Sequence, residues 1–143
     1  MKLEEIVELW NEDVKIDRTE LDAESIKIPS LHNKYYKIYI QEKIKLKAEE
    51  QEHKLYYKLK HEYYTGKLSK QDLDEHGWEP FQFVLKNDIS IYLEADKELG
   101  DRLLKLQVQK EKVQFLEDII KTLNGRGFLI KNAVDFIRFT SGN

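Results

Sequence analysis

The sequence predicts a mainly α-helical protein with two long helices, a connecting loop segment and a short apolar C-terminal helix. Only two prolines and six glycines interrupt the 143 residues, and apolar residues recur every three or four positions over long stretches, the spacing of one helix face. Charged residues make up 36% and hydrophobic residues 41% of the chain. That balance gives a thin core for a monomer and favours self-association, which buries further surface.

The first half of the chain predicts a short helix followed by a long one. Residues 2–15 carry apolar side chains at amphipathic spacing. Pro29-Ser30 predicts a helix start with Ser30 as N-cap. From Leu31 to Tyr64 one long helix is expected, and Thr65-Gly66 is expected to end it, since glycine suits the left-handed residue that closes a helix.

A break and a second long helix are expected in the second half. Turn signals fall across residues 65–87. The aromatic side chains of Trp78, Phe81 and Phe83 could pack under the loop, form a strand-like segment or dock a partner, and packing in the core is the favoured interpretation. The second long helix is predicted over residues 88–123 with Asp88 as its cap, and Asn124-Gly125 is expected to end it. Its apolar spacing suits a coiled-coil-like seam against the first long helix or another subunit.

The C-terminal segment from Phe128 to Phe139 is apolar on more than one side. A helix of this kind needs burial on several faces, and a subunit interface meets that need as well as an internal core does. The apolar segment therefore predicts an oligomerisation region in residues 88–143. Residues 1–87 form the preceding helical region, to which the basic stretch at residues 34–70 assigns DNA binding, and both regions are expected to belong to one continuous domain. The candidate oligomerisation residues are Phe128, Ile130, Val134, Phe136 and Ile137.

Basic charge is concentrated in the middle of the chain. The net charge is −5 over residues 1–33, +5 over residues 34–70 and −3 over residues 71–143. Within the basic part, Tyr56 to Lys67 combines four tyrosines with three lysines, and lysine can meet phosphate while tyrosine stacks on a base. The candidate DNA-binding residues are Lys54, Lys58, Lys60, Tyr63, Tyr64 and Lys67. The alternative is that these tyrosines are core or interface residues and the lysines a solvated face.

Motifs of catalysis and cofactor binding are missing from the sequence. The chain contains no cysteine, no Gly-rich phosphate loop, no His-Glu-x-x-His and no Gly-x-Ser-x-Gly. Glu49 and His53 have metal-ligand spacing on a helix, but a third ligand is not near them in the sequence. We therefore expect no enzyme activity, no cofactor and no metal. Because no long apolar run occurs, we also expect no membrane-spanning helix.

Three motifs in register resemble the UvsY family of phage recombination mediators. Lys58-Leu59-Lys60 followed by Tyr63-Tyr64-Thr65-Gly66-Lys67 is similar to a basic–small–basic pattern followed by Tyr-Tyr-Ser-Gly-Arg. Leu93-Glu94-Ala95-Asp96-Lys97 is similar to the family's Leu-x-Ala-Asp-Lys stretch. Arg126 to Lys131, with Arg138-Phe139 near the end, is similar to its closing Arg-Gly-Phe-x-Ile-Lys. Lys60 stands where the family pattern has arginine, so the planar guanidinium fork is absent there.

The resemblance implies a non-enzymatic mediator of DNA recombination and repair that assembles into a homo-oligomeric ring, a hexamer or heptamer. Its partners would be single-stranded DNA, a phage RecA-like recombinase and the phage single-strand-binding protein, in the cytoplasm of the infected bacterial host. It would load the recombinase onto coated DNA during presynaptic filament assembly, with Lys58 and Lys60 as DNA contacts. An α-helical oligomeric scaffold that binds only proteins is the alternative function.

Overall fold

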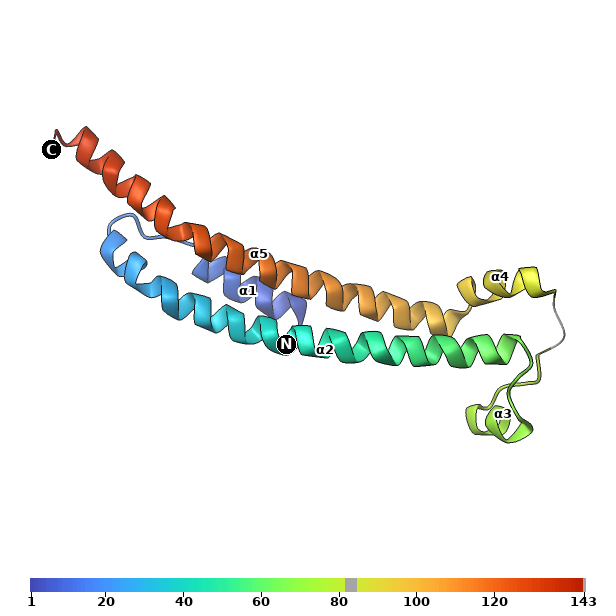
Figure 1. Ribbon diagram of the computed structural model, residues 1–143. Helices are drawn as coiled ribbons and strands as arrows, with labels where there is room; N and C mark the ends of the chain where they lie inside the picture. The colour runs from blue at the N-terminus through green and yellow to red at the C-terminus, as the bar shows by residue number, and fades with distance from the viewer. Residues whose placement is uncertain (82–84, 143) are drawn as a thin grey trace. The chain divides into compact units, whose positions relative to one another are not determined.

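The computed structural model describes residues 1–81 and 85–142, and these residues are mainly helical (Figure 1). The elements in chain order are α1 (Leu3–Asp13), α2 (Leu21–Tyr64), α3 (Lys70–His76), the 3-10 turn η1 (Lys86–Asp88), α4 (Ile89–Glu94) and α5 (Lys97–Thr140). The described part of the chain contains no strand. The predicted mainly helical fold class is thus confirmed, although individual helix boundaries differ from the prediction.

The chain divides into two compact units, Met1–Ile44 with Glu111–Asn143, and Lys45–Lys110. In the first unit, α1 lies beside α2 and α5 (Figure 1). Its core contains Ile6 from α1, Tyr35 from α2 and three residues of α5, each at most 2% exposed: Leu116, Ile119 and Leu123. Burying an aliphatic side chain of this size contributes about 1.5–3 kcal/mol, so this cluster is what attaches α1 to the two long helices.

Arg126 fixes the end of α1 through hydrogen bonds to backbone carbonyls. Its Nη1 donates to the carbonyl of Asp13 at 2.8 Å, and its Nη2 donates to the carbonyls of Val14 at 3.4 Å and Lys15 at 2.8 Å. Nη2 also lies 3.7 Å from the carboxylate of Glu24. The last carbonyls of a helix lack partners within the helix, and here one buried guanidinium from α5 supplies them.

The first long helix starts earlier than the sequence predicts. Pro29-Ser30 was expected to begin it, but α2 begins at Leu21 and contains Pro29. A tertiary contact holds the residues before the proline, because buried Glu24 lies 3.7 Å from Arg126 of α5. Glu24 also pairs with Lys27 within α2 at 3.1 Å. Acidic residues in the first turn also suit the positive end of the helix dipole. These effects outweigh the roughly 3 kcal/mol that an interior proline costs a helix.

The predicted separate C-terminal helix is wrong, because α5 continues through Asn124-Gly125 to Thr140. Leu123, Arg126 and Ile130 are spaced three and four residues apart and are all buried, so burial on one face holds the helix together. Each glycine disfavours the helix by only about 1 kcal/mol, and the positive φ of a helix-ending glycine is not found at Gly125 or Gly127.

The start of the second long helix also differs from the prediction. The chain forms the short helix α4, bends at Ala95 and Asp96, and begins α5 at Lys97. Asp88 makes no side-chain capping bond, whereas Oδ1 of Asp96 accepts the backbone N–H of Leu99 at 2.8 Å. An aspartate in this position satisfies one of the free donors at a helix start, so the predicted capping role falls to Asp96.

The second unit, Lys45–Lys110, combines the second half of α2 with α3, α4 and the start of α5. Buried leucines from α2, α4 and α5 form its apolar interior: Leu46, Leu93, Leu99 and Leu106. The predicted end of α2 is confirmed, since Gly66 adopts φ 71° and the N–H of Lys67 donates to the carbonyl of Glu62 at 2.9 Å. The functional division at residues 87 and 88 stays a prediction. Among the described residues, no helix is long and apolar enough to cross a bilayer.

Candidate nucleic-acid interface

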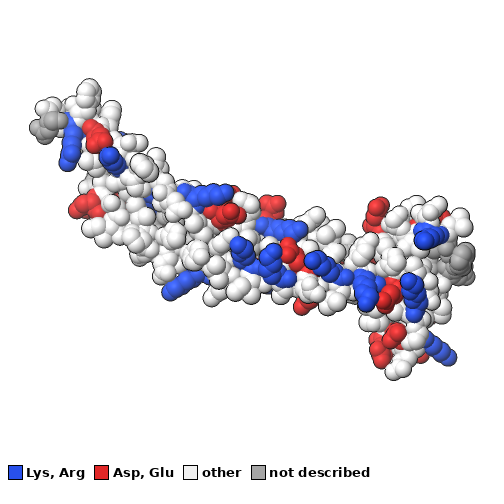
Figure 2. Space-filling view, in the orientation of Figure 1, with Lys and Arg blue, Asp and Glu red and all other residues white. Residues whose placement is uncertain are grey.

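Three of the four predicted lysine contacts are exposed at the end of α2. Lys54 and Lys58 lie on the helix, and Lys67 follows the closing Gly66. The Lys58 side chain is 76% exposed and lies 3.8 Å from Glu62. An exposed ion pair of this kind contributes little stability, so Lys58 remains available to an anionic ligand. Figure 2 shows acidic side chains among the basic ones on the face in view, rather than an unbroken basic surface.

Lys60 has a different environment, because its side chain is buried. Its Nζ lies 3.0 Å from Oδ2 of Asp96 and 3.3 Å from Oε2 of Glu98. The same ammonium lies 4.2 Å from the centre of the Trp78 ring, a cation–π arrangement. Lys60 therefore has three internal partners, from two parts of the second unit. A contact between Lys60 and DNA stays a prediction.

Tyr63 and Tyr64, the last residues of α2, belong to an aromatic cluster. The Tyr63 hydroxyl donates to the carbonyl of Glu79 at 2.7 Å, and the Tyr64 hydroxyl donates to Oδ2 of Asp96 at 2.6 Å. Ring centres in the cluster are 4.8–5.9 Å apart, a range typical of favourable aromatic contacts. The cluster consists of Tyr63, Tyr64, Trp78, Phe81 and Tyr92.

The cluster bears on two predictions. Trp78 and Phe81 pack against Tyr63, which agrees with the favoured inward packing of these residues, although the tyrosine partner was not predicted. Phe83 lies outside the described residues. Stacking of Tyr63 or Tyr64 on a base stays a prediction. Each is about half-buried, and each already contacts neighbouring rings.

The carboxylates around Lys60 are held in their ionised form. Burial would raise the pKa of Asp96, but hydrogen bonds from Tyr64, the Leu99 backbone and Lys60 bring it below its ordinary value. The hydrogen bond from Tyr56 is the largest influence that lowers the pKa of Glu98. Conversely, burial and the bond to Glu98 raise the pKa of Tyr56 to about 12. Lys60 thus lies between two anions at neutral pH, and its charge is compensated inside the protein.

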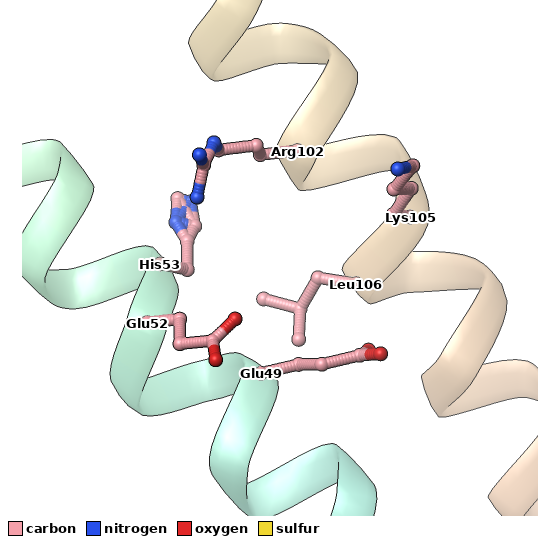
Figure 3. A pocket seen from close by; sticks show the side chains of 6 residues that line it. All are labelled: Glu49, Glu52, His53, Arg102, Lys105 and Leu106. Carbon is pink, nitrogen blue, oxygen red and sulfur yellow. The ribbon is translucent and has the colours of Figure 1, made fainter.

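A pocket of about 320 Å³ lies further along α2 (Figure 3). Glu49, Glu52 and His53 come from α2, and they face three residues of α5: Arg102, Lys105 and Leu106. Two carboxylates against two cations leave this pocket without the excess positive charge that a polyanion needs. The guanidinium of Arg102 is also stacked 3.8 Å from the centre of the Tyr56 ring. Within residues 1–81 and 85–142, no group of three or more His, Cys, Asp or Glu side chains could hold a metal ion.

The predicted oligomerisation residues divide into exposed and buried side chains. Phe128, Phe136 and Ile137 are 72%, 61% and 46% exposed. Val134 is half-buried, and Ile130 is 5% exposed because it faces the interior of its own unit. The last turns of α5 therefore present large apolar side chains to solvent, while Ile130 is part of the fold of the single chain.

Sequence reasoning missed two features of this site. It did not identify Asp96 and Glu98 as partners of Lys60, although Asp96 lies in the Leu-Glu-Ala-Asp-Lys motif. It also did not single out Tyr57, which is 47% exposed. Helical position carries the missing signal, because Tyr56 and Lys60 are four residues apart on the inner face. Tyr57 lies at the edge of that face, between Lys60 and the exposed Lys58.

The fold defines a helical protein with a candidate polyanion-binding surface at the exposed lysines of α2 and with large apolar side chains exposed at the end of α5. Comparison with known proteins specifies the class further. Residues 9–143 match the family model described as "Recombination, repair and ssDNA binding protein UvsY", and the chain belongs to this family. The resemblance inferred from the three motifs is thereby confirmed. The family description names recombination, repair and single-strand binding, and names no catalytic activity.

The relatives come from a bacteriophage. The chain is 28% identical over 142 residues to the recombination protein UvsY of Enterobacteria phage T4, covering 99% of both sequences. It is also similar to crystal structures of the T4 recombination mediator protein UvsY. One matches with a TM-score of 0.84 and 25% identity, covering 99% of this chain and 98% of that one. Another matches with a TM-score of 0.81 and 25% identity, covering 95% and 98%.

Proposed function

We propose that this protein is a recombination mediator that binds single-stranded DNA as a homo-oligomeric ring. It promotes loading of a phage RecA-like recombinase onto DNA coated by the phage single-strand-binding protein, in the cytoplasm of the infected host. Membership of the UvsY family supports this proposal. The observation that assigns DNA binding to particular residues is a set of exposed lysines at the end of α2, namely Lys54, Lys58 and Lys67.

One subunit alone binds a strand weakly on this proposal. Each neutralised phosphate contributes about 0.7 to the salt dependence on single strands, so three exposed lysines give a slope of about 2 per subunit. The chain as a whole carries a net charge of −3, and acidic side chains lie among the basic ones (Figure 2). Several subunits on one strand act through effective concentration, which can raise avidity by roughly 10²–10⁴. Assembly is therefore required for tight binding.

Lys60 contributes to this site by holding it in place. Its buried ammonium joins α2 to the start of α5 through Asp96 and Glu98, and it lies against Trp78 in the segment after α3. Since Lys58 lies two residues before Lys60 on the same helix, these contacts fix the helix end from which Lys54, Lys58 and Lys67 reach the phosphates. Lys60 is a positioning residue in this proposal.

The exposed end of α5 supports the assembly part of the proposal. Large apolar side chains that are exposed together mark interaction sites, and Phe128, Phe136, Ile137 and Phe139 are 46–82% exposed. A ring of six or seven subunits presents as many copies of the lysine set to one strand. A strand held over such a surface is available to the recombinase while the single-strand-binding protein is displaced.

The lysine assignment is tested with matched alanine variants. Lys58→Ala combined with Lys54→Ala is compared with Lys121→Ala, because Lys121 also lies in an exposed i,i+4 pair, 3.7 Å from Glu117. Binding of fluorescent poly-dT is measured over a salt series. We expect the double variant to bind more weakly with a flatter salt slope, whereas the control matches the wild type. Unchanged affinity in the double variant would refute the lysine assignment.

Assembly is tested separately by sedimentation. Phe136→Ser with Ile137→Ser is compared with Ile26→Ser, a similar loss of exposed apolar surface at a residue that is 78% exposed in α2. We expect smaller species only for the C-terminal variant, with helix content unchanged. If the C-terminal variant keeps the wild-type mass, the assembly element lies elsewhere. If a folded wild-type oligomer binds no strand at low salt, the scaffold that binds only proteins becomes the better explanation.

A further inference from the structure

Tyr57 differs from the other tyrosines at the end of α2. The hydroxyls of Tyr56, Tyr63 and Tyr64 donate to Glu98, Glu79 and Asp96 within the unit. The side chain of Tyr57 is 47% exposed. Exposed tyrosine rings next to cations are the usual stacking surfaces for the bases of single strands. Of the two kinds of tyrosine here, the exposed one has a free ring surface.

A pocket of about 250 Å³ lies directly beside Tyr57. Three leucines give it an apolar interior, Leu93 from α4 and Leu99 and Leu103 from α5. Polar side chains also line it, namely His53, Ser90 and Glu94. Pockets that hold drug-sized ligands measure about 300–1,000 Å³, so this smaller pocket suits one flat ring system. All of its residues belong to the second unit, Lys45–Lys110.

Helix geometry places the pocket next to the exposed lysines. At 3.6 residues per turn, Tyr57 lies about 60° around the helix from Lys54 and about 100° from Lys58. His53, four residues before Tyr57, lies on the same side of α2 and also lines the pocket. The tyrosine ring thus separates an apolar pocket on one side from two exposed cations on the other. A nucleotide has the same arrangement, with a flat base joined to an anionic phosphate.

We propose that this pocket takes one nucleobase of a bound single strand, with Tyr57 stacked on the base and the phosphates against Lys54 and Lys58. The proposal rests on the proposed function, since it assigns a base-binding site to the same strand. Glu94, which lines the pocket, determines the orientation of the bound nucleotide. Its carboxylate repels phosphate and can accept a hydrogen bond from the amino group of a base. The base therefore enters on the Glu94 side and the backbone stays on the lysine side.

The experiment compares Tyr57 variants on strands with and without bases. Tyr57→Ala removes the ring, Tyr57→Phe keeps it, and Tyr36→Ala is the matched control because Tyr36 is 46% exposed elsewhere on α2. Each protein is titrated with a fluorescent oligonucleotide of ordinary nucleotides and with one of equal length made of abasic sites. Salt series are recorded for both strands, and melting curves check that each variant folds.

We expect Tyr57→Ala to weaken binding of the ordinary strand by about fivefold to about a hundredfold, the effect of one lost base stack. The salt slope stays that of the wild type, because the phosphate contacts are unchanged. Tyr57→Phe and Tyr36→Ala bind like the wild type. On the abasic strand the wild type and Tyr57→Ala bind equally, since neither can place a base.

Three results would overturn the proposal, and they have different consequences. If the wild type binds the ordinary strand with steep salt dependence and Tyr57→Ala binds it equally well, the pocket takes no base while the proposed function stands. If the wild type binds neither strand, the proposed function fails and the base pocket fails with it. An equal loss for Tyr57→Ala on both strands would likewise contradict stacking, because the abasic strand has no base to stack.

Discussion

Replacing Lys60 with methionine is expected to destabilise the protein by about 3 kcal/mol, near the lower end of the range for removing one partner of a buried ion pair. The side chains of Lys60 and Asp96 are only 6% and 5% exposed, so the remaining carboxylate is left without its cation. The expected destabilisation is near the lower end of that range because Asp96 keeps its hydrogen bonds from the Tyr64 hydroxyl and the Leu99 backbone.

The assay is thermal or urea denaturation followed by helix circular dichroism at one fixed protein concentration, because association changes apparent stability. For a chain of this size, about 3 kcal/mol corresponds to a fall in Tm of roughly 6–12 °C. Lys58→Met is the control. Its side chain is 76% exposed, and a surface substitution of this kind stays within about 0.5 kcal/mol of the wild type.

A second variant separates the lost charge from lost packing. Lys60→Met combined with Asp96→Asn leaves no buried charge unpaired at this position, and asparagine can still accept the Leu99 N–H as a helix cap. The double variant is therefore expected to be more stable than Lys60→Met alone. Stability of Lys60→Met equal to that of the wild type, or no recovery in the double variant, would refute the assignment of Lys60 as a buried partner of Asp96.

Three further predictions concern stability. The pKa of Asp96 is lowered in the folded state. Its contribution to the free energy of unfolding is therefore complete above the unfolded pKa of about 4 and is lost as the pH falls through the folded pKa. The loss of stability on acidification should be shallower in Asp96→Asn than in the wild type, and an identical loss would contradict this prediction. Gly125→Ala should stabilise α5 by about 0.5–1 kcal/mol, because an added Cβ meets nothing within 4 Å. Urea denaturation measures this change, and a loss of stability in the variant would indicate that the helix ends at Gly125. Arg126→Met should cost about 3 kcal/mol or more, because buried Glu24 and the end of α1 lose their partner, and amide exchange in Leu3–Asp13 should become faster; unchanged exchange would oppose this role.

Periodicity in the sequence was sufficient to predict the helical fold class, and local turn chemistry was sufficient to predict the end of α2. Prediction from the sequence failed where contacts between residues far apart in the chain determine the helix ends. Pro29 and Gly125 are strong local signals for helix ends, yet α2 and α5 continue past them. Arg126 contributes in both places, because it pairs with Glu24 before the proline and is buried just after the glycine, between buried Leu123 and Ile130. No window of neighbouring residues contains that information.

The candidate site was predictable as a basic, tyrosine-rich stretch, and its internal division was not. Lys58 and Lys60 look equivalent in composition, but one is 76% exposed at its side chain and the other 6%. The difference arises because Lys60 shares the inner face of α2 with Tyr56, while Lys58 faces outward. The carboxylates that compensate Lys60 come from the start of α5, far along the chain.

The attachment of α1 to α5 has a consequence for the order in which the nascent chain can fold. Ile6 packs on Leu116, Ile119 and Leu123, and Arg126 bonds to the carbonyls that follow α1. The contacts of α1 with α5 can therefore form only after the much later α5 residues have been synthesised, whereas its contacts with Tyr35 of α2 can form earlier. The continuous segment Lys45–Lys110 can form its own contacts earlier. Before the contacts with α5 form, the net charge of −5 over residues 1–33 keeps this segment hydrated and disfavours its aggregation.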